Sequence, residues 1–292
     1  MFLSHTDRYT LYSLANEVLH KLFEYCCANR IVINFDKCCF MEFGTLQPDN
    51  HNYSLGILNS AFNKVENCKF LGVYISSSLN WTLQIKHAKS QVSKATGAMN
   101  SVKKIIPQKL LRNIYFALVQ PYIVYCAPIW GSIHNTKDYE DLFKAQKKAV
   151  RVISNMTHKI NHCFANTKPL FHKNNILTVH NMYFYLLATE AFKILNNRSP
   201  KNIFQFFEIS CRSIRLITPK FRLTSMQTKS FSFTASKVIN FLLQSDICYS
   251  GYTLKSFKGK LKSHLIFKQS LCIKNDPNWL PLNYNIYSDV NI

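Results

Sequence analysis

The feature that most constrains the fold is an unbroken apolar repeat between residues 81 and 102. Its spacings of four and three alternate, which keeps one stripe of an α-helix turned toward a partner helix. The members of the repeat are Trp81, Ile85, Ala88, Val92, Ala95, Met99 and Val102. Asn80, just before it, is a suitable helix cap. The pattern predicts a long helix that packs along its length, so this part of the chain is a helical domain.

Two further helices are predicted after this one. Pro107 suits the first turn of the second helix. Its expected inward residues are Leu110, Leu111, Ile114, Tyr115, Leu118 and Val119. Pro121 and Pro128 are expected to interrupt it, because proline lacks the amide hydrogen that a helix needs. The third helix starts near Asp138, with an acidic first turn and a basic last turn that match the helix dipole.

The segment before the repeat mixes one helix with short strands. Asp7 can cap a helix with an apolar face. That face consists of Leu11, Leu14, Ala15, Val18, Leu19, Leu22 and Cys26. Residues 31–33 and 39–41 are predicted to be short strands on either side of a polar turn. A strand pair is expected over residues 65–75, with Gly72 inside it marking a bulge or a close backbone approach.

Beyond residue 157 the pattern is less regular. Residues 176–195 predict a long, mostly buried helix, and residues 254–268 a basic one. Residues 200–244 show short strand-like runs separated by polar breaks. The tail after Asp276 is expected to be loop, because it contains two prolines and many asparagines.

The charge distribution favours a nucleic-acid partner. The chain has 36 Lys and Arg against 15 Asp and Glu, a formal net charge of +21. Acids are absent between Glu66 and Asp138 and again between Asp141 and Glu190. Such a surface attracts polyphosphates, and abundant aromatic side chains can stack on bases. A membrane surface is disfavoured, because no helix combines a basic face with a Trp-rich apolar face. A merely basic surface is the plain alternative.

Other classes are excluded by what the sequence lacks. No apolar run is long enough to span a membrane, and the N-terminus does not resemble a secretory signal. Because no secretory signal is recognised, the ten cysteines are expected in a reducing compartment, and we expect a nuclear or cytoplasmic protein that is not secreted. The cysteines include no Cys-x-x-Cys, so neither a zinc ribbon nor a redox dithiol is indicated. His158, His162 and Cys163 have helical spacing without a recognisable fourth ligand, so no metal site is expected. Nucleophile, P-loop and dinucleotide signatures are absent.

Nine short segments, in order along the chain, resemble the reverse transcriptases of non-LTR retrotransposons, LINE elements of the jockey-like kind. Two of them are Lys69-Phe70-Leu71-Gly72-Val73-Tyr74-Ile75 and Leu79-Asn80-Trp81. The full set covers residues 28–37, 69–75, 79–81, 119–125, 130–131, 146–153, 169–171, 175–179 and 256–262. Each segment alone is a weak signal, and the ordered set is a strong one.

The resemblance implies an α+β fold with three parts, the first of which combines a helix with short antiparallel strands. Residues 1–78 would be the last part of a palm with primer-grip-like strands, residues 79–156 a helical thumb, and residues 157–292 a mostly helical C-terminal extension with a disordered tail. In the family a catalytic Asp-Asp turn immediately precedes the segment that matches Phe2, and this sequence contains no Asp-Asp pair. Two-metal nucleotidyl transfer needs such carboxylates. We therefore expect a truncated, inactive chain without a cofactor of its own, and Mg²⁺ only in the intact polymerase.

The resemblance also assigns site residues. Lys37 matches a lysine that could protonate the pyrophosphate leaving group, and an ordinary turn lysine is an equal alternative. Phe70, Leu71 and Gly72 match the primer grip. Cations of the thumb would contact the phosphate backbone of RNA or an RNA/DNA duplex. They are Lys86, Lys89, Lys94 and Lys103, with Lys144, Lys147, Lys148 and Arg151 as a similar set.

Three functions remain open at this point. The first is an inactive remnant of an RNA-directed DNA polymerase, with an intact copy acting in trans as a further partner. The second is a non-enzymatic nucleic-acid-binding protein that retains the basic thumb. The third is a translated relic without function.

Overall fold

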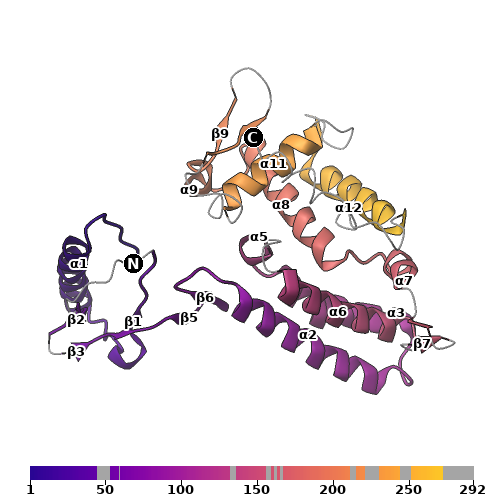
Figure 1. Cartoon of the computed structure of the whole chain (residues 1–292), viewed down its shortest axis with the longest axis horizontal. Coiled ribbons are helices and arrows are strands. Elements are labelled where there is room, and N and C mark those ends of the chain that lie inside the picture. The colour runs from indigo at the N-terminus through magenta and orange to yellow at the C-terminus, as the bar shows by residue number, and fades with distance from the viewer. Residues whose placement is uncertain are drawn as a thin grey trace. The chain divides into compact units, whose positions relative to one another are not determined.

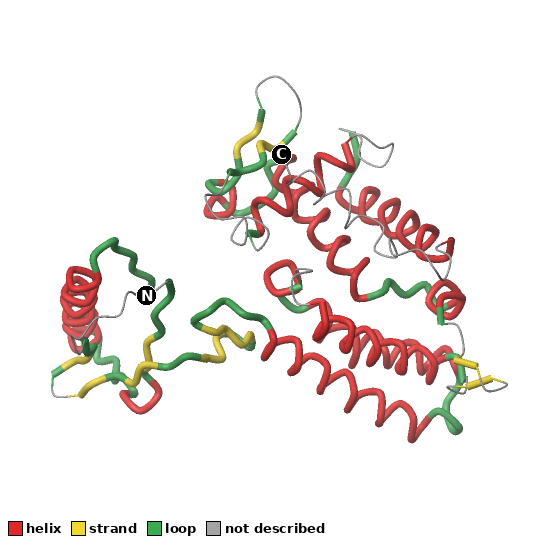
Figure 2. Tube along the Cα trace, viewed as in Figure 1, coloured by secondary structure: helices red, strands yellow, loops and turns green. Residues whose placement is uncertain are grey.

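The computed structural model describes residues 1–44, 53–58, 60–131, 136–155, 159–160, 163–164, 167–210, 215–220, 230–243 and 251–271. Over these residues the chain is α+β, with many helices and a few short strands (Figure 2). It forms two compact units, Met1–Leu83 and Gln84–Ile292. The expected tail after Asp276, together with His158 and His162, lies outside the described residues.

Helices dominate the second unit and strands are concentrated in the first (Figure 1). The helices are α1 (Arg8–Ala28), the 3-10 turn η1 (Phe35–Lys37), α2 (Thr82–Val102), α3 (Gln108–Ile114), the π-helical turn η2 (Tyr115–Val119), α4 (Gln120–Val124), α5 (Ala127–Trp130), α6 (Thr136–Ile153), α7 (Lys168–Lys173), α8 (Val179–Leu195), α9 (Lys201–Phe204), α11 (Phe231–Leu243) and α12 (Leu254–Leu271).

The described strands form two-stranded pairs. The antiparallel pairs are β2 (Gly56–Ile57) with β3 (Ser60–Ala61), β5 (Asn67–Phe70) with β6 (Val73–Ser76), β7 (Lys159–Ile160) with β8 (Cys163–Phe164), and β9 (Glu208–Ile209) with β10 (Leu216–Ile217). A parallel pair joins β1 (Cys39–Phe40) to β4 (Asn63–Lys64). The expectation of antiparallel strands alone in the first unit is therefore wrong for β1 and β4.

Helix α1 builds the core of the first unit. The Asp7 carboxylate caps it by accepting a hydrogen bond of 2.7 Å from the backbone N–H of Thr10, as the sequence predicts. The buried core residues are Tyr12, Ala15, Leu19, Leu55 and Ile57. Leu14 and Leu22, which we expected on the inner face, are exposed. The covered face of the helix is the one that carries Tyr12, Ala15 and Leu19, against which Leu55 and Ile57 pack.

A buried carboxylate joins α1 to the strands. Glu42 accepts hydrogen bonds from Tyr12 Oη and Lys64 Nζ, at 3.2 and 2.6 Å, and pairs with Arg8 Nε at 2.9 Å. Burial disfavours the charged form of Glu42. The hydrogen bonds and positive charges of Lys64 and Arg8 outweigh it, so the pKa of Glu42 is lowered. The charged form of Glu42 therefore favours the folded state.

The strand predicted over residues 31–33 is wrong. The backbone N–H of Ile31 donates to Cys26 O at 2.8 Å, and Arg30 has a φ of 56°, so this stretch ends α1 instead of pairing with a strand. The strand prediction over residues 39–41 is confirmed for Cys39–Phe40. The backbone N–H of Ile31, which a strand would pair with a neighbour, is used instead to end the helix.

The apolar repeat at residues 81–102 is confirmed as α2. Ile85, Ala88, Val92 and Met99 are buried in one stripe. The Asn80 side chain accepts a hydrogen bond of 2.9 Å from the backbone N–H of Thr82, the first residue of the helix. Helix α6 runs beside α2 as the partner (Figure 1), and an ion pair crosses between them.

The second predicted helix continues past Pro121. The π-helical turn η2 lies directly before α4, so the wider turn accommodates the proline without ending the helix. The break comes at Cys126, whose φ is 51°. Leu110 and Leu118, expected inward, are exposed, because the buried stripe takes every fourth residue (Leu111, Tyr115, Val119 and Ile123).

Helix α8 is the centre of the second unit. Helices α4, α5, α6, α11 and α12 all pack against it, which explains why it is buried on nearly every side. The prediction over residues 176–195 is confirmed from Val179 onward, and α12 confirms the predicted basic helix. Helix α11, by contrast, lies in a region read as strand-like runs. Its β-branched and aromatic residues favour strands locally, and packing on α8 overrides that preference.

Two buried glutamines hold the segment that enters α8. Gln146 Nε2 donates to Tyr115 Oη and to Leu177 O, and its Oε1 accepts from Val179 N, each at 2.9 Å. Gln269 Nε2 donates to Ile176 O at 2.8 Å.

Among the described residues no helix is both long and apolar enough to cross a bilayer.

Candidate nucleic-acid interface

Four cations from two helices gather on one surface of the second unit. We call Lys144, Lys147, Arg151 and Lys168 the α6–α7 cationic cluster. On α6, spacings of three, four and seven residues place Lys144, Lys147 and Arg151 on the same face. Lys147 is half-buried, and its Nζ lies 3.9 Å from the centre of the Phe143 ring. The apolar core fixes Phe143, so the ring provides a rigid base for that ammonium group.

The cluster is under electrostatic strain. The pKa of Lys147 is lowered, first by burial and then by the positive charges of Arg151, Lys144 and Lys168, with Glu140 partly opposing the shift. Burial also lowers the pKa of Arg151. Cations that disfavour each other's charge gain free energy when an anion comes between them. The arrangement can therefore hold the phosphates of a polyanion.

One carboxylate forms ion pairs with two of the lysines that were predicted to contact phosphate. Asp141 pairs with Lys144 at 2.9 Å and with Lys89 of α2 at 3.0 Å. These two hydrogen-bonded lysines lower the pKa of Asp141 to about 2. Since one negative charge faces both ammonium groups, Lys89 and Lys144 attract phosphate less strongly than their sequence positions suggest.

The structure distributes the other predicted thumb lysines differently. Lys86 and Lys94 are exposed on α2, and Lys148 is exposed on α6 beside the cluster. Lys103 does not lie on the outer face of α2. The helix ends at Val102, and Lys103 occupies the turn that follows. The helical period ends one residue before Lys103, so the prediction that Lys103 lies on this face is wrong.

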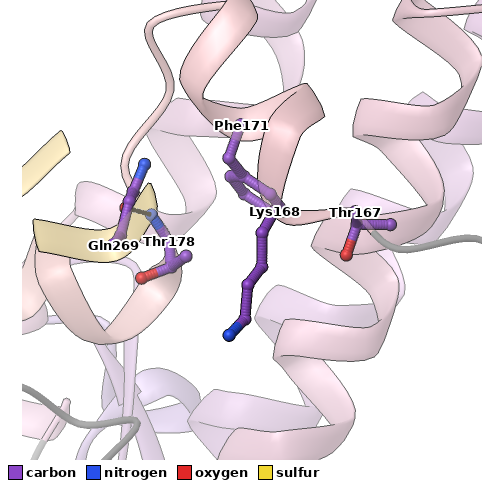
Figure 3. A pocket seen from close by; sticks show the side chains of 5 residues that line it. All are labelled: Thr167, Lys168, Phe171, Thr178 and Gln269. Atoms are coloured by element: carbon purple, nitrogen blue, oxygen red, sulfur yellow. Dashed lines mark hydrogen bonds between the residues drawn. The ribbon is translucent and has the colours of Figure 1, made fainter. Parts of the chain in front are cut away.

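A small hollow adjoins Lys168. Figure 3 shows its lining: Thr167, Lys168, Phe171, Thr178 and Gln269. Its free volume is about 10 Å³, room for about one water molecule. Gln269 Oε1 accepts a hydrogen bond of 3.3 Å from Thr178 N at its edge. The hollow is too small for a base or a phosphate, so the candidate interface is the surface above α6 and α7.

A second basic pair lies where α3 and η2 approach α12. Arg112 Cζ is 4.7 Å and Lys262 Nζ 6.0 Å from the centre of the Phe116 ring. Arg112 Nε donates to Asn174 O at 2.7 Å, which fixes the guanidinium group. Burial, and then the charge of Arg112, lower the pKa of Lys262. Like the cationic cluster, this pair places positive charges beside a phenylalanine ring.

Sequence reasoning missed Lys168, Arg112 and Lys262 as site residues. They belong to three different helices, and no spacing along the chain relates them to α6. The available signals were the acid-free stretches: the one between Glu66 and Asp138 includes Arg112, and the one between Asp141 and Glu190 includes Lys168.

The predicted primer-grip residues form the connection of the β5–β6 hairpin. Phe70 pairs with Val73, so Leu71 and Gly72 make a two-residue loop. Their φ angles are 46° and 86°. Gly72 is thus a turn residue and not a bulge within a strand, which corrects our expectation. Phe70 and Leu71 are 61% and 76% exposed. The hairpin therefore presents two exposed apolar side chains at its tip.

Lys37 lies in an exposed turn of the first unit. It is the last residue of η1, and its backbone N–H donates to Asn34 Oδ1 at 3.2 Å. The geometry is that of an ordinary capped turn, which leaves both readings of Lys37 open. Within the described residues no three His, Cys, Asp or Glu side chains group closely enough to hold a metal ion.

Comparison with known proteins adds no assignment. The chain matches no protein family, no curated protein and no solved structure. The function therefore has to be argued from the site itself and from the ordered sequence resemblance.

Proposed function

We propose that this chain descends from the RNA-directed DNA polymerase of a non-LTR retrotransposon and binds the phosphate backbone of RNA or of an RNA/DNA duplex. The observation that carries the proposal is the α6–α7 cationic cluster, in which four cations share one surface. The order of the nine resembling segments supports the descent from a polymerase. The cluster supports the binding.

The chemistry of the cluster suits backbone phosphates. Burial is the main cause of the lowered pKa of Lys147, and the charges of Arg151 and Lys168 add to it. A phosphate placed among the three cations would offset that repulsion. Contacts of this kind position a duplex without reading its sequence. We therefore expect affinity to depend strongly on salt and weakly on base composition.

The β5–β6 hairpin supports a second contact. Leu71 adopts a left-handed backbone, which costs a non-glycine residue about 1–2 kcal/mol. An exposed apolar side chain that keeps such strain is typical of a functional contact. In the proposed lineage, the primer end is the partner of this tip.

We propose no catalytic step for the chain alone. Nucleotidyl transfer requires clustered carboxylates to hold two metal ions, and this sequence has no adjacent aspartates. Binding by a non-enzymatic protein rests on the same cluster. A primer-extension assay with Mg²⁺ tests the absence of catalysis: we expect no extension by the chain alone, and extension would contradict the proposal.

The test is a salt titration of binding. Fluorescence anisotropy with a labelled RNA/DNA hybrid gives the affinity as a function of salt for the wild type and for the triple variant Lys147→Gln/Arg151→Gln/Lys168→Gln. Removing three phosphate contacts should flatten the logarithmic salt slope by roughly 2.7, at about 0.9 per contact. Lys201→Gln on α9, an exposed lysine of the same unit, is the matched control and should leave the slope unchanged.

Two outcomes count against the proposal. An unchanged slope in the triple variant, with an intact circular-dichroism spectrum, removes the cluster from the binding face. Wild-type protein with no salt-dependent binding leaves the relic without function as the remaining hypothesis.

A further inference from the structure

Two cations from distant parts of the chain approach the same aromatic ring in the second unit. Arg112 lies on α3, and Phe116 follows four residues later in η2. Lys262 belongs to α12. Arg112 Cζ is 4.7 Å and Lys262 Nζ 6.0 Å from the centre of the Phe116 ring. Tertiary packing therefore places two positive charges from separate segments beside one ring.

A rigid anchor orients Arg112. Its Nε donates a hydrogen bond of 2.7 Å to the backbone oxygen of Asn174. Asn174 is itself buried, and its side-chain amide donates to Ser154 Oγ at 3.1 Å and to Leu170 O at 2.8 Å. Within the described part of the chain, no hydrogen bond or ion pair uses the two terminal nitrogens of Arg112. The anchored guanidinium group therefore keeps its terminal N–H groups for a ligand, in the fork geometry that matches phosphate oxygens.

The surroundings leave both charges unbalanced. The elements that contribute to this place, α3, η2, α7 and α12, contain no aspartate or glutamate. Over the residues that the structure describes, neither Arg112 nor Lys262 forms an ion pair with a carboxylate. Burial, and then the charge of Arg112, lower the pKa of Lys262. The two cations disfavour each other, so an anion bound between them would be stabilised by both.

We propose that Arg112 and Lys262 form a binding site for a phosphate monoester, supplied by the end of a nucleic-acid strand or by a free nucleotide. A monoester carries about two negative charges near neutral pH, which balances both cations. A backbone phosphodiester carries only one. The site uses none of the four residues of the α6–α7 cationic cluster, so it goes beyond the proposed backbone binding and does not depend on it.

Paired oligonucleotides test the site in the full chain. Two single-stranded RNAs of the same sequence, each labelled with fluorescein at the 3′ end, carry either a 5′-phosphate or a 5′-hydroxyl group. Fluorescence anisotropy gives both dissociation constants, and their ratio cancels the contribution of the backbone. We expect the wild type to bind the 5′-phosphorylated RNA about tenfold more tightly, because a hydrogen bond to a charged group contributes at least that factor.

A second measurement separates the two sources of the phosphate. Isothermal titration calorimetry compares adenosine 5′-monophosphate with adenosine. Binding of the monophosphate alone, without a preference between the two RNAs, assigns the site to a free nucleotide. A preference between the RNAs without binding of the monophosphate assigns it to strand ends.

Three variants connect the discrimination to the site. Lys262→Gln removes one charge and no hydrogen bond to a described residue, and it should bring the ratio of dissociation constants close to one. Arg112→Lys keeps the charge, loses the fork and should also lower the ratio. The matched control is Lys255→Gln, an exposed lysine in the first turn of α12, and it should keep the wild-type ratio.

Two results would overturn the inference. The wild type could fail to discriminate both between the two RNAs and between adenosine 5′-monophosphate and adenosine. The discrimination could also persist unchanged in Lys262→Gln and Arg112→Lys. The wild-type comparison can refute the site by itself, so a variant that fails to fold does not leave the question open. An unchanged salt slope in the triple variant of the α6–α7 cationic cluster concerns only the proposed backbone binding, which keeps the two failures distinct.

Discussion

Replacement of Gln146 by leucine should destabilise the second unit severely. Gln146 is 1% exposed and satisfies three groups: Tyr115 Oη, Leu177 O and Val179 N. Leucine is close to glutamine in size, so the variant Gln146→Leu makes no large cavity. The variant does remove the hydrogen bonds that the glutamine makes with these three groups.

The magnitude follows from the three groups left without that partner. Each buried polar group without a hydrogen bond costs about 1–3 kcal/mol, which gives roughly 3–9 kcal/mol for three. The apolar leucine recovers about 2 kcal/mol through burial. We expect a net loss of about 1–7 kcal/mol, centred near 4 kcal/mol, which is a large share of the 5–15 kcal/mol that stabilises a typical domain.

Urea denaturation followed by circular dichroism measures the loss. The control Gln108→Leu changes an exposed glutamine at the start of α3 and should shift the free energy of unfolding by no more than about 0.5 kcal/mol. Tyr115→Phe removes one of the three groups. The double variant Gln146→Leu/Tyr115→Phe should therefore lose less free energy of unfolding than the sum of the losses of the two single variants. A loss below about 1 kcal/mol for Gln146→Leu, or strict additivity, would refute the reasoning.

Three further predictions concern the other features. Leu71→Asn should stabilise the first unit by about 1 kcal/mol, because asparagine tolerates a left-handed backbone before glycine, whereas Leu71→Ala should not; equal unfolding midpoints for the two variants would contradict the strain. Glu42 has a lowered pKa, so its stabilisation of the folded state is present above the ordinary glutamate pKa of 4.5 and is lost as pH falls through the folded-state pKa. Glu42→Gln should therefore flatten the fall in the free energy of unfolding at acid pH. An unchanged acid limb of the stability–pH curve would exclude the effect. Asp141→Asn should free Lys89 and Lys144, raise the affinity for an RNA/DNA hybrid and steepen the salt slope by up to about 2. The control Asp138→Asn removes the same charge without releasing these lysines. Identical salt slopes for the two variants would show that the lysines do not reach phosphate.

Local sequence signals predicted the elements whose cause is local. The caps at Asp7 and Asn80 and the apolar repeat of α2 need only neighbouring residues, and all three are confirmed. The β5–β6 hairpin was predicted for the same reason, although its turn was not. Leu71-Gly72 lacks the Asn-Gly signature of a two-residue hairpin loop, so the sequence indicated a bulge.

Other elements could not be predicted because distant packing decides them. Helix α11 has strand-favouring residues and becomes helical on the surface of α8. Residues 31–33 look like a strand, and they end α1. Leu14 is apolar and spaced as a core residue, yet it is exposed, because burial depends on what the rest of the chain brings to each face.

The candidate site divides in the same way. The sequence by itself determined the cationic face of α6, because helical periodicity places Lys144, Lys147 and Arg151 together. Tertiary packing added Lys168 and the Arg112–Lys262 pair, and it opposed Lys89 with Asp141. The physical reason is that side-chain spacing within one helix follows from its 3.6-residue turn, whereas contacts between segments depend on how separate elements pack, and no local pattern encodes that packing.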